Sequence, residues 1–259
     1  MSRGCCAVPV LPSDSSPRTP EEVVAQAADA ASLSVLDARI ADCFACPRLV
    51  AWRTDIAVTR RAAFRDQEYW GRPVPGWGAA DAEIAILGLA PAAHGGNRTG
   101  RIFTGDRSGD VLFAALHRAG LANQPTSVSV DDGLQLRHTR IFAAVRCAPP
   151  DNKPLPQERD TCAPWVRREL ELIKPTLRVV VALGAFAWQA WWPAMTAAYG
   201  VRPPVPRPKF GHGAHVSLPG VPDLLGCFHV SQQNTFTGKL TPVMLDGVFA
   251  RAKALAGLA

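Results

Sequence analysis

The chain has 259 residues, a formal net charge of +6 and a hydrophobic content of 47%. This length fits one large domain or two small ones, and the hydrophobic content suffices for a substantial core. No apolar run approaches the roughly 20 residues that span a bilayer, which excludes a membrane-spanning helix. The N-terminus also lacks the features of a secretory signal, so we expect a cytoplasmic protein. The modest basic excess is compatible with a polyanionic partner such as nucleic acid.

The N-terminal residues 1–20 are rich in Pro, Ser and Gly, and this composition predicts a disordered tail. The segment TPEE at 19–22 predicts the start of a helix. Threonine can cap, proline suits the first turn, and glutamates favour the positive end of a helix. We expect this helix to run towards Asp42 and to end near the segment CFACP.

Four continuous apolar runs predict the strands of a parallel sheet, and they lie at 83–88, 139–145, 177–183 and 224–230. Continuous apolar runs are typical of strands that are covered on both faces. Helix patterns occupy the segments between and after these runs, at 108–118, 164–173, 186–198 and 242–255. This alternation predicts an α/β layered fold, in which ligands bind beyond the carboxyl ends of the strands. The loops that follow the four runs are therefore the candidates for a functional site.

The cysteines predict a metal centre. Cys43 and Cys46 form a C-x2-C pair, and Cys147 and Cys162 lie in predicted loops farther along the chain. Four thiolates satisfy either a zinc ion or a [4Fe–4S] cluster. The alternative is that these are ordinary buried cysteines. No function is expected for the remaining cysteines, which are Cys5, Cys6 and Cys227.

The loop after the first apolar run is rich in glycine. Its sequence, GLAPAAHGGNRTGRIFTGDRSGD at 88–110, matches neither G-x-G-x-x-G nor the P-loop pattern. Glycines allow a backbone or a flat ligand to approach closely. Phe103 could be a core residue or an aromatic face for a planar ring, and Asp106 could cap the following helix or orient a water molecule. Arg98 and Arg101 are either contacts to a nucleic-acid backbone or ordinary surface charges.

The fourth apolar run ends in HVSQQNTFTGKLT at 229–241. Neutral donors in such a loop suit phosphates and base edges. The alternative is a solvated polar loop in which His229 is a core histidine.

Together, these two loops closely resemble the type B, or family 5, uracil-DNA glycosylases. The segments CFACPRL and VRCAPPDNKPLP resemble the same enzymes and their type A relatives, so that the resemblance covers roughly 41–255. It implies one domain over 21–259, a three-layer α/β/α sandwich around a four-stranded parallel sheet. It also implies a structural [4Fe–4S] cluster, whose ligands would be Cys43, Cys46, Cys147 and Cys162.

The reaction implied by the resemblance is hydrolysis of the N-glycosidic bond to uracil in DNA, by a monomer that acts at the nucleoid. The target base leaves the stack to enter the site. Phe103 would stack under the base, and His229 would donate a hydrogen bond to a uracil oxygen as negative charge builds on the leaving base. The backbone at Gly88, Ala90 and Ala92 would contact the base.

The other roles follow from the same resemblance. Asp106 would hold a water molecule or stabilise the cationic sugar, because Ala92 and its neighbour cannot activate water. Phosphates and the gap left by the base would be contacted by Ser231, Gln232, Asn234 and Thr235. The Pro-rich segment 201–215 is either a spacer or a basic flap that adds backbone contacts.

Type A relatives read uracil with an asparagine that corresponds here to about Ala143, which cannot hydrogen-bond a base edge. Asn152 is the nearest substitute. This loss predicts a broader range of substrates, including uracil and other deaminated or modified bases such as hypoxanthine. The segments 88–110 and 229–241 contain a single lysine, Lys239. A Schiff-base step needs a lysine in the site, so this scarcity predicts a monofunctional glycosylase. The alternative function is a non-catalytic iron–sulfur protein that binds nucleic acid or transfers electrons.

Overall fold

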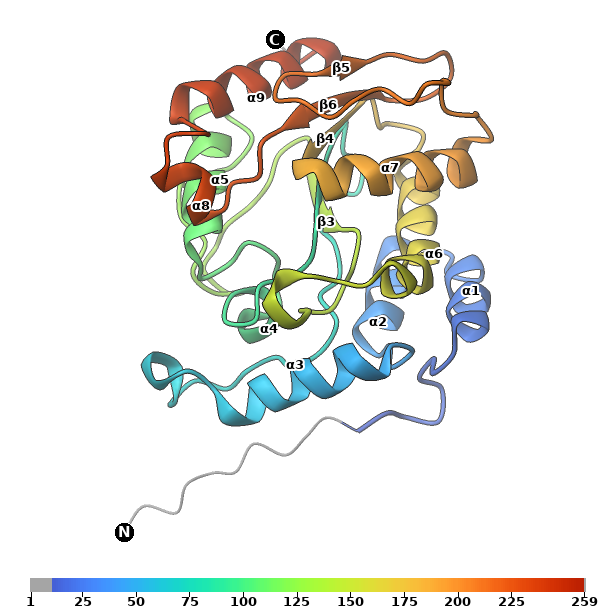
Figure 1. Ribbon diagram of the computed structural model, residues 1–259, viewed down its shortest axis with the longest axis vertical. Helices are drawn as coiled ribbons and strands as arrows, with labels where there is room; N and C mark the ends of the chain where they lie inside the picture. Colours follow the sequence, from blue (N-terminus) through green and yellow to red (C-terminus); the bar gives the residue numbers. More distant parts are fainter. Residues whose placement is uncertain (1–10, 259) are drawn as a thin grey trace.

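The computed structural model describes residues 11–258, and their strands form one mixed sheet with the order β1-β3-β2-β4-β6-β5 (Figure 1). The strands are β1 (Trp77–Gly78), β2 (Ile84–Gly88), β3 (Thr139–Ala143), β4 (Val179–Leu183), β5 (His215–Val216) and β6 (Asp223–Cys227). The α-helices are α1 (Pro20–Ala28), α2 (Leu33–Ala41), α3 (Pro47–Thr59), α4 (Gly96–Thr99), α5 (Arg107–Arg118), α6 (Pro156–Ile173), α7 (Gly184–Tyr199), α8 (Gln232–Phe236) and α9 (Pro242–Ala256). Two short 3-10 helices, η1 (Ala62–Phe64) and η2 (Pro150–Asn152), lie in loops.

The four predicted strands form the parallel centre of the sheet. β2 pairs in parallel with β3 and with β4, and β4 pairs in parallel with β6. The sheet is wider than predicted, because β1 and β5 each add an antiparallel two-residue strand at an edge. Two residues are too few for a readable hydrophobic period, which is why the sequence predicted four strands and not six.

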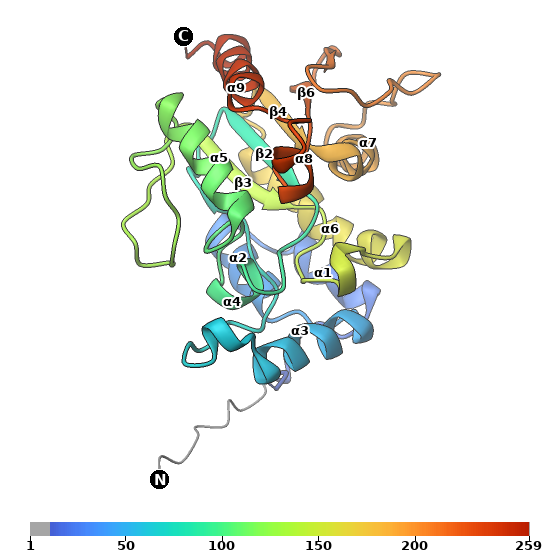
Figure 2. The same ribbon diagram turned by 60° about the vertical axis from the view of Figure 1, so that its left-hand side comes forward.

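Helices cover both faces of the sheet, which gives the predicted three layers (Figure 2). On one face, Ile84 and Ile86 of β2 pack with apolar residues of α5 and α9. On the other face, Ala85 and Leu87 pack with apolar residues of α6 and α7. Because successive side chains of a strand point to opposite faces, both faces of β2 must be apolar, and its continuous apolar run is explained.

The N-terminal region differs from the prediction of one long helix. α1 ends at Ala28, and α2 begins after Ser32, whose Oγ accepts a hydrogen bond from the backbone N of Val35 at 3.3 Å. This serine cap fixes a separate start that the apolar pattern alone did not reveal. The helix predicted at 164–173 likewise begins earlier, at Pro156, and contains Pro164 in its interior.

Part of the predicted disordered tail, from Ser13 onward, makes contacts with the helical region. Ser16 is buried, and its Oγ donates to the Asp42 carboxylate at 2.6 Å. The backbone N of Phe44 donates to the carbonyl of Pro17 at 2.8 Å. Residues from Ser13 onward are thus tied to the helical region, whereas 1–10, with Cys5 and Cys6, lie outside the described residues. Within 11–258, no helix combines the length and the apolar character needed to cross a membrane.

Candidate active site

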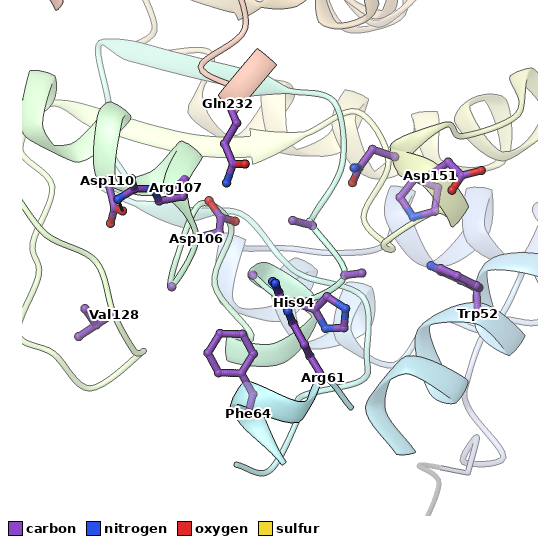
Figure 3. A pocket seen from close by; sticks show the side chains of 16 residues that line it. Trp52, Arg61, Phe64, His94, Asp106, Arg107, Asp110, Val128, Asp151 and Gln232 are labelled. Atoms are coloured by element: carbon purple, nitrogen blue, oxygen red, sulfur yellow. Dashed lines mark ion pairs between the residues drawn. The ribbon is translucent and has the colours of Figure 1, made fainter. Parts of the chain in front are cut away.

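A cleft of about 650 Å³ opens at the carboxyl ends of the parallel strands (Figure 3). It lies between the glycine-rich loop that follows β2 and the N-terminus of α8. Four residues that the sequence singled out line it, namely Ala92, Asp106, Asn152 and Gln232. The structure therefore places segments 88–110 and 229–241 on opposite sides of one cleft. This is the edge of the sheet where the topology predicted the site.

Phe103 and His229 lie next to each other, and neither is among the residues that line the cleft. Their ring centroids are 6.2 Å apart, with an angle of 43° between the planes. Phe103 is 6% exposed and belongs to the same apolar cluster as α5 and α9, so it is a core residue as well as a neighbour of the histidine. A Cβ atom on Gly88 would lie 3.2 Å from Cζ of Phe103, which explains why this position carries no side chain. Gly88 and His229 thus each lie beside the Phe103 ring.

Phe103 has a positive φ of 56°, which is costly for an aromatic residue. The next glycine, Gly105, has a φ of 68°, so the loop turns twice through left-handed conformations. These turns carry the chain from the Phe103 ring back to Asp106 at the cleft wall. The glycines of this loop therefore shape the backbone around one aromatic ring.

Burial lowers the pKa of His229 to about 4. The imidazole is therefore neutral at physiological pH and keeps one N–H to donate. The side-chain amide of Asn234 donates to the His229 carbonyl at 2.8 Å, and Thr235 donates to the Ser231 carbonyl at 3.2 Å. Asn234 and Thr235 thus brace the loop around His229, and Gln232 is the member of this segment that lines the cleft.

Asp106 caps a helix, which is one of the two roles considered for it, and it also lines the cleft. Its Oδ1 accepts a hydrogen bond from the backbone N of Gly109 at 2.9 Å, at the N-terminus of α5. Its Oδ2 packs against Gly95, where a Cβ atom would clash with it. Burial raises the pKa of this carboxyl group, while backbone hydrogen bonds from Gly109 and Ser108 act in the opposite direction.

Asn152 is exposed and follows Asp151 in η2, and both residues have a positive φ, of 55° and 53°. Asparagine tolerates the left-handed region better than most residues. The turn places Asn152 at the rim of the cleft, on the strand-β3 side. Ala143, which the resemblance aligns with the asparagine of type A enzymes, ends β3 and is 1% exposed.

Several cleft residues were not predicted. Trp52 comes from α3, and Arg61 and Phe64 come from the segment around η1. His94 also lines the cleft, and its Nδ1 lies 3.0 Å from the hydroxyl of Tyr69. Burial, and then the charges of Arg61 and Arg98, lower the pKa of His94. The segment around η1 combines aromatic and basic residues, which was the signal available in the sequence.

Arg98 and Arg101 are not ordinary surface charges, because both are buried. Arg98 donates to the carbonyls of His94 and Gly105, each at 2.8 Å. Arg101 forms an ion pair with Asp132 at 2.7 Å. Both guanidinium groups therefore hold the glycine-rich loop in shape.

Four cysteines from three segments line one small cavity. Cys43 follows α2, Cys46 precedes α3, Cys147 follows β3, and Cys162 lies within α6 rather than before a helix. None is in a disulfide. Burial raises the pKa of Cys43 to about 11 and that of Cys46 to about 12. Across residues 11–258, no three His, Cys, Asp or Glu side chains converge on a point where one metal ion could be held.

The cysteine sulfurs receive hydrogen bonds from two arginines. Nη1 of Arg53 is 3.0 Å from Sγ of Cys147, and the backbone N of Arg146 is 3.3 Å from Sγ of Cys162. Cys227 lies elsewhere, buried at the end of β6. Cys147 and Cys162 thus accept hydrogen bonds at sulfur, whereas the Sγ of Cys227 donates to the carbonyl of Phe228.

Comparison with known proteins decides the family. The model of the uracil DNA glycosylase superfamily matches residues 75–253. The chain belongs to this superfamily. A type-5 uracil-DNA glycosylase of Mycobacterium bovis is 57% identical over 90% of this chain and 85% of its own length. A type-5 enzyme of Thermus thermophilus is 52% identical over 83% of this chain and 94% of its own.

More distant similarity extends to a type-4 uracil-DNA glycosylase of Thermotoga maritima, which is 29% identical over 60% of this chain and 63% of its own length. The higher identity and coverage of the type-5 relatives confirm the predicted type B assignment.

Proposed function

We propose that this member of the uracil-DNA glycosylase superfamily is a monofunctional glycosylase that hydrolyses the bond between uracil and deoxyribose in DNA, and so starts base excision repair. The observation that carries the proposal is the meeting of segments 88–110 and 229–241: Asp106 and Gln232 from them line one cleft, and the rings of Phe103 and His229 are 6.2 Å apart. The names of the type-5 relatives point to the same activity. They do not support the alternative of a non-catalytic iron–sulfur protein.

The chemistry follows from the groups at the site. An extruded base stacks on Phe103, and the neutral imidazole of His229 donates to a base oxygen as the bond to the sugar breaks. A neutral donor suits this step, because its hydrogen bond strengthens as the base gains negative charge. Asp106 supplies negative charge for the cationic sugar and holds a water molecule at the wall of the cleft. Hydrolysis then leaves an abasic site and a free base.

A lyase step has no support in this site. Lys239 is exposed, and its Nζ lies 5.0 Å from the centroid of the Phe228 ring, outside the cleft lining. Water is therefore the acceptor of the sugar.

We further propose a broad substrate range. Ala92 and Ala93 line the cleft with methyl groups, and Ala143 is buried at the end of β3. Polar contact with the Watson–Crick edge of a base is left to backbone groups and to Asn152 at the rim. A site with few side chains that hydrogen-bond the base edge discriminates weakly among bases that differ in exocyclic groups. Uracil, hypoxanthine and other deaminated bases are the substrates to test.

The four cysteines that line one cavity are proposed to hold a structural [4Fe–4S] cluster. Thiolates are the ligands of such clusters, and hydrogen bonds to the sulfurs, as from Arg53, are part of their usual surroundings. Through these cysteines, a bound cluster would link the start of α3 and the helix α6 to the loop after β3. The protein is proposed to act on the chromosome as a monomer.

The test is incubation with a uracil-containing duplex followed by alkali, which breaks DNA at abasic sites. We expect strand breaks at uracil for the wild type and a large loss for His229→Ala. Tight binding of the duplex without breaks would overturn the proposed activity. The same assay with hypoxanthine in place of uracil tests the substrate range separately.

A further inference from the structure

Arg53 is a buried cation for which the described structure offers no anion. Its side chain is 1% exposed in the middle of α3. No carboxylate lies within ion-pair distance of it in the described part of the chain. A buried guanidinium that lacks a counter-charge is strongly unfavourable, because its desolvation is not compensated.

The hydrogen bonds of Arg53 point to the cysteine cavity. Nη1 is 3.0 Å from Sγ of Cys147, and Nη2 is 3.0 Å from the carbonyl of Cys43. Nε has no partner, and the guanidinium carbon lies 4.9 Å from the centroid of the Phe44 ring. Two of its three nitrogens are thus committed to the segments that carry two of the four cysteines.

The other charges near this cavity are balanced. Arg140 and Arg146 share Glu169, and Arg140 also pairs with Asp37 at 3.0 Å. Arg48 and Glu158 form a pair at 2.7 Å. Arg53 is therefore the positive charge left over beside the cysteines.

We propose that Arg53 is the positioning residue of the iron–sulfur cluster: its guanidinium supplies the counter-charge for the cluster and orients the Cys147 thiolate. The inference rests on the proposed cluster. Four thiolates bring more negative charge than the cluster core neutralises, so the loaded site is an anion that a buried cation stabilises. The same charge favours the reduced form of the cluster, because reduction adds a further negative charge.

The side-chain role can be separated from a backbone role. Nδ2 of Asn97, in the glycine-rich loop, donates to the carbonyl of Arg53 at 3.1 Å. Substitutions of the Arg53 side chain keep this carbonyl. A change in the cluster can thus be measured while the hydrogen bond between Arg53 and Asn97 of the glycine-rich loop is kept.

The experiment compares anaerobically purified wild type with Arg53→Met, Arg53→Lys and a matched control, Arg48→Met combined with Glu158→Gln. The control removes an ion pair of zero net charge that joins α3, the helix of Arg53, to α6. The readouts are iron content, the rate of iron loss to a chelator, and the reduction potential from a titration followed by electron paramagnetic resonance. In Arg53→Met we expect iron loss to be about tenfold faster and the potential to be more negative. Arg53→Lys and the control should stay close to wild type.

The outcomes distinguish two failures. Wild type without iron overturns the proposed cluster and this inference with it. Wild type with a cluster, but with Arg53→Met unchanged in iron loss and potential, overturns the role of Arg53 alone. An equal shift in Arg53→Lys or in the control also overturns it. If Arg53→Met does not fold, the comparison of Arg53→Gln with Arg53→Lys decides, because equal iron loss in the two excludes a role for the charge.

Discussion

Replacing Asp106 by asparagine separates the two tasks of this carboxylate. Asparagine is as good a helix cap as aspartate, so the hydrogen bond from the backbone N of Gly109 is kept and the stability should change little. Asp106→Ala loses the cap as well and should cost about 1 kcal/mol. A unit charge about 4 Å from the sugar cation is worth up to about 4 kcal/mol at an effective dielectric of about 20. Asp106→Asn should therefore lower the rate of the chemical step by as much as about three powers of ten.

The assay is single-turnover excision of uracil from a duplex, combined with denaturant unfolding of the same variants. Because burial raises the pKa of Asp106, the wild-type rate should fall with decreasing pH at a higher pH than an ordinary aspartate would give. This acid limb should be absent in Asp106→Asn. An Asp106→Asn enzyme with the wild-type rate, or one that loses activity only as far as it loses stability, would refute the reasoning.

His229→Ala should slow excision by roughly a hundredfold to a thousandfold, as measured in single turnover, because one donor to the leaving base is lost. Burial lowers the pKa of His229 from 6.5 to about 4, so the unfolded chain binds a proton that the folded chain does not. The free energy of unfolding should thus fall by about 3 kcal/mol between pH 6.5 and 4, and His229→Ala should lack this component. Gly88→Ala should slow excision roughly tenfold without unfolding the protein, since its Cβ would lie 3.2 Å from the Phe103 ring; an unchanged rate would count against the stacking role. Arg101→Met should cost about 3–5 kcal/mol in denaturant unfolding, because it leaves Asp132 buried and unpaired, and a drop in DNA affinity alone would contradict the structural role.

The parts of the fold that the sequence predicted are those governed by local pattern. Continuous apolar runs located the four parallel strands, and β2 was expected at 83–88 and found at Ile84–Gly88. The start of α9 followed from Thr241, whose side chain does accept a hydrogen bond from the backbone N of Met244. Where packing overrides a local rule, the prediction failed. The proline rule predicts a helix start at Pro164, yet Pro164 lies within α6, which packs against the sheet and α1.

The site was predictable only as far as its segments are continuous in sequence. The glycine-rich loop and the segment after β6 carry their own signal, and the structure does bring Phe103 and His229 together. Trp52 and Phe64 were missed because they reach the cleft from a distant N-terminal segment. The burial of Arg98 could not be predicted either. The sequence pattern around a loop arginine is the same whether its charge faces water or the carbonyl groups of its own loop.

The two short antiparallel strands at the margins of the sheet bear on how the protein behaves in concentrated solution. A parallel strand at an edge would present a row of free backbone N–H and C=O groups to any neighbouring chain. Here β1 and β5 occupy both borders, and each is only two residues long. Such short edge strands offer almost no template for intermolecular strand pairing. The edges of the sheet should therefore resist the aggregation to which open sheets are prone.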